Sequence, residues 1–273
     1  MSTLTIRRLL VDLDSPIPRH WAGDAFRTAF FNALSMSFPA GEQFFIDSIR
    51  KGLANLPPER RESFALEVQG FIGQEATHRR IHQRFNDHLA KQGLVNSWEP
   101  RIVSRRPLVE SIDVRNWVAV TAATEHLTAI FSEHLLQHPE LLDGASQNLR
   151  DMWMWHCSEE TEHRSTAFEI YTALGGAHAW RCKIFQVVTR SFALDLTRQT
   201  LRNLWDDGSW WRPSTWVQGW RLLFGPKGFV SCGREPWRRY LRADFHPDQA
   251  DGSASQAWLK EHAALVPPVR AVA

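Results

Sequence analysis

The sequence HCSEETEH at residues 156–163 contains a Glu-x-x-His motif, and so does the sequence EATHRRIH at residues 75–82. The two motifs consist of Glu75 with His78, and of Glu160 with His163. Residues three or four positions apart share one face of an α-helix, so the carboxylate and the imidazole of each motif point in the same direction. One further histidine extends each face by a turn: His156 in the first segment and His82 in the second.

Both of these faces are otherwise apolar. Phe71 precedes one motif at helical spacing, and Ile170 follows the other. Such periodicity predicts amphipathic helices over about residues 58–91 and 140–174. The motif side chains therefore occupy positions where core residues are expected.

Each predicted motif helix follows a helix that carries one glutamate on its apolar face. Glu42 precedes Glu75 by 33 residues, and Glu125 precedes Glu160 by 35 residues. These spacings fit two helical hairpins, each with a lone glutamate followed by a Glu-x-x-His motif. Ionised carboxylates lose their hydration when they are buried. Four carboxylates and three histidines in one core therefore require compensating positive charge, which divalent metal ions supply.

The two hairpins predict a four-helix bundle within residues 24–178. Pro39 and Gly41 are predicted to kink or break its first helix. Residues 93–111, which contain two prolines and a tryptophan, are predicted to form a long connection between the hairpins. A third helix is predicted over about residues 112–137.

The two ends of the chain are predicted to lie outside this bundle. Residues 1–23 are expected to form an extended arm. Eight of the 13 tryptophans follow residue 178, so residues 179–273 form a Trp-rich extension with a helix over about 180–205. The polar part from Pro247 onward is expected to be partly disordered. Because strand-like alternation is absent from the sequence, the predicted fold is all-α, with one domain over residues 1–273.

The paired pattern resembles that of ferritin-like di-iron and di-manganese four-helix bundles, in which two helices each give a glutamate and two others each give a Glu-x-x-His motif. Four segments also resemble a bacterial family labelled "predicted metal-dependent hydrolase": SFPAGEQFF at 37–45, GQEATH at 73–78, TEHLTA at 124–129 and HCSEETEH at 156–163. The additional His156 is similar to the ligand pattern of di-iron aromatic-amine N-oxygenases. These resemblances imply the metal ligands Glu42, Glu75, His78, Glu125, His156, Glu160 and His163, with His82 as a further candidate.

Alternative interpretations of these residues are open. The site is a two-metal centre, a mononuclear zinc site, or a set of ordinary polar residues on long helices. His82 is a ligand, a group that orients a ligand, or a core histidine bonded to a carboxylate. Two sets of neighbours are predicted to lie outside the site: Glu159 and Glu162, solvated or bonded to arginines such as Arg164, and His126, Glu133 and His134 at the surface. Cys157 is expected to be a packing residue.

The composition excludes several classes of protein. The chain has 32 basic and 30 acidic residues and a net charge of +2, which does not indicate a nucleic-acid binder. Its three cysteines form no CxxC motif, which excludes a disulfide scaffold and a thiolate metal site. The sequence shows no signal peptide and no apolar stretch of about 18 residues, so a cytoplasmic location is expected.

The function predicted from these features is O2-dependent oxidation of an apolar or aromatic organic substrate by a di-iron or Mn/Fe centre, with zinc less expected. The expected partners are the small-molecule substrate, O2, an electron-donor protein and a second copy of the chain, but not nucleic acid. One alternative is two-metal hydrolysis of an ester or phosphate, and another is non-catalytic metal binding or iron storage. The Trp-rich extension packs over the bundle, admits substrate, or contacts a membrane or a partner.

Overall fold

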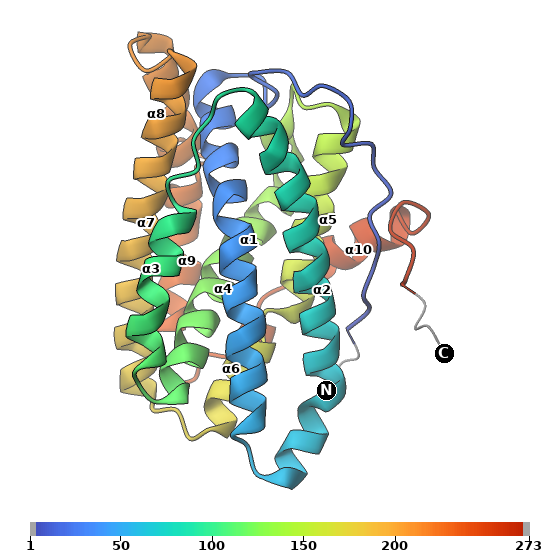
Figure 1. Ribbon diagram of the computed structural model, residues 1–273, viewed down its shortest axis with the longest axis vertical. Coiled ribbons are helices and arrows are strands. Elements are labelled where there is room, and N and C mark those ends of the chain that lie inside the picture. The colour runs from blue at the N-terminus through green and yellow to red at the C-terminus, as the bar shows by residue number, and fades with distance from the viewer. Residues whose placement is uncertain (1–3, 270–273) are drawn as a thin grey trace.

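The structure, a computed structural model, describes residues 4–269 apart from the side chain of residue 110, and every regular element in this range is a helix. Most of the helices lie along the long axis of an elongated molecule (Figure 1). The one β feature within the described range is an antiparallel bridge between Arg7 and Pro268, near the two ends of the chain. The predicted all-α bundle is therefore confirmed. None of the helices in this range is both long and apolar enough to cross a membrane.

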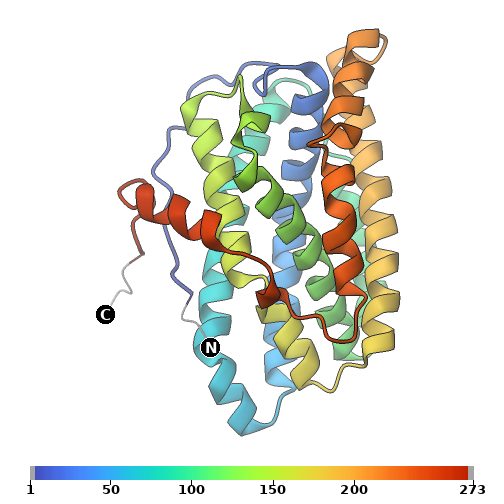
Figure 2. The same cartoon turned by 180° about the vertical axis from the view of Figure 1, so that it is seen from behind.

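The bundle is built from two hairpins. Its helices are α1 (Ala25–Ala54), α2 (Pro58–Lys91), α4 (Val114–Gln137), α5 (Gln147–His163) and α6 (Thr166–Ala173). Helix α1 packs along α2, and α4 packs along α5 and α6 (Figures 1 and 2). Helix α4 also packs against α1, which brings the two hairpins together.

Helix α1 continues through Pro39 and Gly41, so the predicted break is wrong. A proline inside a helix leaves the carbonyl four residues earlier without its usual amide donor. Here the side-chain amide of Asn86, on α2, donates to the Ser35 carbonyl at 2.9 Å and replaces the missing bond. This tertiary contact stabilises the continuous helix, and Glu42 stays on its buried face.

Two predicted boundaries also need correction. Helix α3 (Glu99–Glu110) occupies most of the predicted connection over 93–111, and the Asn96 side chain caps its start by accepting two backbone N–H bonds at 3.1 Å. The single helix predicted over 140–174 is divided into a short 3₁₀ helix, α5 and α6. Gly144 lies between the 3₁₀ helix and α5 with a φ of +96°, a conformation that favours glycine and ends regular helix.

The C-terminal extension packs over the bundle. It consists of α7 (His178–Asp207), α8 (Pro213–Phe224), α9 (Phe229–Tyr240) and α10 (Ser253–Glu261). Helix α7 contacts α1 and α4, α9 contacts α4, and α10 crosses α5 on another side of the bundle (Figure 2). The predicted partial disorder from Pro247 onward is wrong for the residues up to 269. A 3₁₀ turn and α10 form there, and Trp258 is buried. Residues 270–273 lie outside the described part.

Two apolar clusters fill the bundle on either side of its middle. One contains Phe31, Phe85 and Trp153, and the other contains Phe64 and Phe71. On the bundle helices, the polar motif residues lie between the segments that supply these two clusters. A buried polar layer therefore crosses the centre of an otherwise apolar core.

Candidate metal centre

Seven candidate ligands meet in this polar layer. They are Glu42 on α1, Glu75 and His78 on α2, Glu125 on α4, and His156, Glu160 and His163 on α5. Each is at most 2% exposed. The layer forms because every one of these residues occupies an inward-facing position on an amphipathic helix.

The donor atoms form two neighbouring groups. Glu42, His78 and His156 make up one group, and Glu75, Glu160 and His163 make up the other; within each group the donor atoms lie within 4.8 Å of one another. These two groups hold six of the seven predicted ligands.

Glu160 connects the two groups, and Glu125 joins the second. The Glu160 Oε1 atom lies 3.4 Å from His78 Nδ1, 3.6 Å from His156 Nε2 and 3.5 Å from His163 Nε2. The Glu125 Oε2 atom lies 3.4 Å from His163 Nε2. One carboxylate is thus within reach of all three imidazoles, which suits a residue placed between two cations.

Most donor atoms of the layer have no hydrogen-bond partner among the described residues. These buried atoms are both carboxylate oxygens of Glu42, Glu75 and Glu125, Oε2 of Glu160, Nδ1 of His78 and Nε2 of His163. Buried polar atoms without partners are rare in folded proteins because each loses its hydration without compensation. Here nine such atoms gather in one layer, and oxygen and imidazole nitrogen are ordinary ligands for divalent metal ions. The residues therefore fit a metal centre.

The carboxylates of the layer differ in their protonation. Burial raises the pKa of Glu42, Glu75 and Glu125 well above the usual range, and the charge of Glu160 adds to the effect. Burial also opposes ionisation of Glu160, but the neighbouring histidines outweigh it and hold the pKa of Glu160 well below its usual range. Three carboxylates therefore resist ionisation unless cations are close to them.

Each of the three histidines has a partner on the ring nitrogen that faces away from the four glutamates of the layer. These contacts are His78 Nε2 to Glu159 Oε2 at 3.0 Å, His163 Nδ1 to Gln74 Oε1 at 3.0 Å, and His156 Nδ1 to His82 Nε2 at 3.2 Å. The other nitrogen of each ring faces the carboxylates. Metal-binding histidines are commonly held in this way, because the outer contact fixes both the ring orientation and the position of the proton.

A hydrogen-bonded chain determines which nitrogen of His156 is free. The Asn86 amide donates to a backbone carbonyl, so its oxygen accepts the hydroxyl proton of Ser35 at 2.8 Å. Ser35 Oγ then accepts from His82 Nδ1, also at 2.8 Å, and His82 Nε2 accepts from His156 Nδ1. His156 Nε2 therefore carries no proton, and its lone pair faces the carboxylate of Glu160. Both ring nitrogens of His82 are engaged in this chain, one with Ser35 and the other with His156.

The structure confirms an arginine partner for Glu159 and Glu162, but this arginine is Arg7 and not Arg164. Glu159 is fully buried, and its partners are His78 and the N-terminal arm residue Arg7, whose Nη1 lies 3.1 Å from Glu159 Oε1. Arg7 also contacts Glu162 at 2.7 Å. Arg164, the arginine named from the sequence, pairs with Glu133 instead. No local pattern around Arg7 could have identified it, because 152 residues separate it from Glu159.

Three residues predicted at the surface take part in packing and do not join the centre. His134 is buried and bonds the Lys227 carbonyl at 3.0 Å. The His126 ring stacks on Tyr240, with ring centroids 4.7 Å apart. Glu133 is half-buried against Arg164. Cys157 is fully buried, as expected for a packing residue, and burial raises the pKa of its thiol to about 12.

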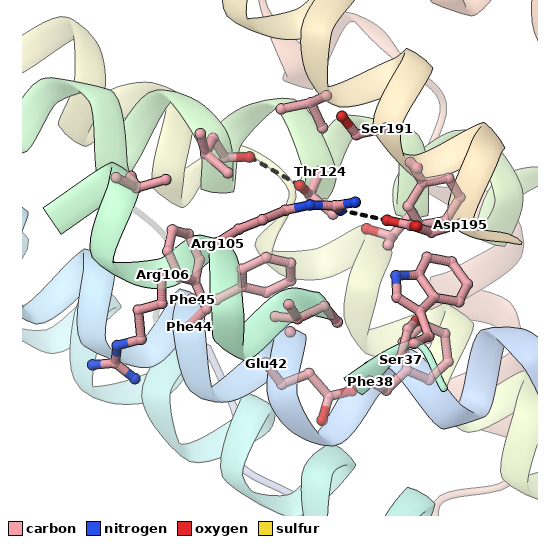
Figure 3. A pocket seen from close by; sticks show the side chains of 18 of the residues that line it. Ser37, Phe38, Glu42, Phe44, Phe45, Arg105, Arg106, Thr124, Ser191 and Asp195 are labelled. Atoms are coloured by element: carbon pink, nitrogen blue, oxygen red, sulfur yellow. Dashed lines mark hydrogen bonds and ion pairs between the residues drawn. The ribbon is translucent and has the colours of Figure 1, made fainter. Parts of the chain in front are cut away.

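An apolar cavity of about 240 Å³ reaches the centre from the side of α3 and α7. Figure 3 shows Glu42 at one end of this cavity, and Arg105 and Asp195 across from it, joined by an ion pair. Phe38 and Phe45 line the wall between them. A small apolar molecule in this cavity would therefore lie against a candidate ligand.

A second cavity of about 570 Å³ lies between α1, α4, α7 and α9 and reaches His156. The two cavities share Phe38, Thr128 and Phe192 as lining residues. Each thus approaches a different member of the group formed by Glu42, His78 and His156. The extension therefore contributes walls to both approaches through α7.

The fold and the polar layer define a class of protein: an all-helical bundle with a buried carboxylate and histidine centre suited to metal ions. The chain belongs to the family described as "predicted metal-dependent hydrolase", whose model matches residues 5–251. No curated protein and no solved structure gives a significant match. The resemblance to this family is confirmed. The family description supports the hydrolase alternative better than O2-dependent oxidation, the main prediction from the ligand spacing.

Proposed function

We propose that this protein is a hydrolase that uses two divalent metal ions to act on an ester or phosphate of an apolar compound. The observation that carries the proposal is the convergence of seven buried donors, most of them without partners, in a member of a metal-dependent hydrolase family. Glu42, His78 and His156 would hold one ion, and Glu75, Glu125 and His163 the other. Glu160 lies within reach of both sets.

The charges of the layer support two ions. When all four glutamates are ionised they carry four negative charges, which two divalent cations neutralise. Without such compensation, burial and mutual repulsion favour protonation of Glu42, Glu75 and Glu125. The donors are oxygen and imidazole nitrogen without sulfur, a set that accepts zinc, manganese and iron.

When bound, the metal ions supply Lewis acidity and a water molecule activated near neutral pH. The protein supplies orientation and a dry environment. Glu159 and Gln74 hold the His78 and His163 rings in place. Phe38 and Phe45 line the cavity beside Glu42, where they exclude water and contact the apolar part of a substrate.

The test is to load the purified protein with zinc, manganese or iron and to measure turnover of aryl esters and aryl phosphates. We expect hydrolysis that requires the metal and is lost in Glu75→Ala. Glu169→Ala removes a half-exposed glutamate outside the layer and serves as the matched control. Hydrolysis that continues unchanged after metal removal would contradict the proposal.

Oxidation by O2 at a di-iron or Mn/Fe centre is the second candidate function. One specific observation favours it: all candidate ligands are glutamate or histidine, and they come from helices in the pattern of ferritin-like di-metal bundles. The same samples distinguish the candidates. Rapid O2 consumption by the reduced iron form, without turnover of esters or phosphates by any metal form, supports oxidation and contradicts hydrolysis.

A further inference from the structure

The cavity of about 570 Å³ has the size and the walls of a binding site for an apolar molecule. Small-molecule pockets in proteins commonly measure about 300–1,000 Å³. The walls are mainly aromatic and aliphatic side chains, including Phe30, Leu34, Phe131, Leu196 and Phe229. A long apolar group can therefore replace water throughout most of this space, with a gain from buried apolar surface.

The inner end of the cavity touches the candidate metal centre. His156 lines it there, and so does Phe38, whose ring stacks on the His156 imidazole with centroids 4.6 Å apart and planes inclined by 19°. His156 Nε2 is in turn 3.6 Å from Glu160 Oε1. A molecule that fills the cavity consequently extends to the reacting centre.

The outer end of the cavity carries two arginines. Arg234 and Arg238 are exposed, line the cavity and lie four residues apart on α9, so they share one helix face. Among residues 4–269 neither guanidinium has a carboxylate partner. Arg239, on the same helix, lies 3.5 Å from Glu235 and does not line the cavity. The cavity therefore joins an apolar interior to a rim with two available cations.

We infer that this cavity binds an amphiphilic substrate, with its apolar chain inside and an anionic carboxylate or phosphate group on Arg234 and Arg238. The inference rests on the proposed function, since it names the class of substrate that reaches the same centre. Guanidinium groups bind carboxylate and phosphate through paired N–H donors, which selects an anionic head group over a neutral one. The ester bond to be cleaved would lie in the part of the molecule beside His156.

The test is a fluorescence titration of the purified protein with dansylaminoundecanoic acid and, in parallel, with its uncharged methyl ester. Both probes are kept below their micelle concentrations. We expect the acid to bind at least about tenfold more tightly than the ester, because only the carboxylate accepts charge-assisted hydrogen bonds from the two guanidinium groups. The double variant Arg234→Gln/Arg238→Gln should remove this preference and leave binding of the ester unchanged.

Two further variants separate the cavity from the rim. Gly233→Leu places a side chain in the cavity and should weaken the binding of both probes. A Cβ at Gly233 meets only Ile130, at 3.4 Å. The control Arg239→Gln should change neither affinity. Equal binding of acid and ester by the wild type, or loss of the preference in Arg239→Gln, would overturn the inference. Because both arginines are exposed, the double variant is expected to fold even if Gly233→Leu does not.

Metal content is measured on the same samples, which keeps the two proposals distinguishable. A protein that binds metal ions but does not prefer the acid contradicts the substrate class and leaves the hydrolase proposal standing. A protein that prefers the acid but holds no metal ions supports the cavity assignment and contradicts the proposed function.

Discussion

The bundle and the C-terminal extension depart from ordinary packing in opposite directions. The centre of the bundle buries four glutamates and three histidines among aromatic residues. On α7, α8 and the turn between them, five tryptophans remain 44–66% exposed: Trp205, Trp210, Trp211, Trp216 and Trp220. Buried ionisable groups and exposed large apolar groups are the informative exceptions to globular packing.

This difference between buried ionisable groups and exposed tryptophans indicates separate roles for the bundle and the extension. Buried carboxylates without partners either take up a proton or need a nearby cation, so the bundle is where we propose that the metal ions bind. The extension reaches that centre through the inner faces of α7 and α9, which form cavity walls. Two of its exposed tryptophans, Trp205 and Trp210, stack on each other with ring centroids 5.1 Å apart.

The largest expected effect follows from removing Glu160. Glu160→Ala should abolish metal binding, because this carboxylate is within 3.6 Å of all three candidate histidine ligands. Metal analysis after gel filtration measures the result, with Glu169→Ala as the control. Wild-type metal content in Glu160→Ala would contradict the assignment of the metal ions to the buried layer of the bundle.

Tryptophan substitutions compare the two regions by stability. Trp153→Ala removes a fully buried ring between Phe31 and His82 and should lower the free energy of unfolding by about 3–5 kcal/mol. Trp211→Ala removes a ring that is 64% exposed and should change it by less than about 0.5 kcal/mol. Urea denaturation of both variants measures the difference. Similar losses in both would show that the exposed tryptophans belong to a structural core.

Removing the residue that orients His78 should have a smaller effect on metal binding. Glu159→Ala leaves His78 Nε2 without its partner, removes one of the two carboxylates that Arg7 contacts, and should weaken metal affinity by about 10- to 100-fold. Competition with a metal chelator measures the affinity, and Arg7→Ala should produce a loss in the same direction. Unaltered affinity in Glu159→Ala would mean that the layer holds metal ions without this support.

The smallest effect concerns the contact of α4 with the segment before α9. Burial lowers the pKa of His134, so the folded protein favours the neutral imidazole. This stability is present above the ordinary histidine pKa of about 6.5 and is lost as the pH falls toward the lowered value. The melting temperature of wild type should exceed that of His134→Asn by about 2 °C at about pH 7.5, and by less at about pH 5. A difference that grows on acidification would contradict this assignment.

The sequence predicts the layer because its residues follow helical periodicity. Each ligand position repeats the three- and four-residue spacing of its neighbours, so local rules place all seven side chains on inner faces. The all-α class and the order of the hairpin helices follow from the same periodicity.

The remaining features depend on contacts between distant residues. The carbonyl that Pro39 leaves without an amide donor is bonded by Asn86 on α2, and the buried Glu159 is paired with Arg7 of the N-terminal arm. Neither pairing has a sequence spacing that identifies it. The rim arginines on α9 likewise come to line the same cavity as His156 only through the packing of α9 on α4.

The central claim is that the buried layer holds two divalent metal ions. The most direct measurement is the metal content per chain of protein purified from cells without chelator, by inductively coupled plasma mass spectrometry, for wild type and Glu160→Ala side by side. The account predicts about two ions per wild-type chain and none in Glu160→Ala. Less than one ion per wild-type chain, even after incubation with zinc, manganese or iron, would contradict it.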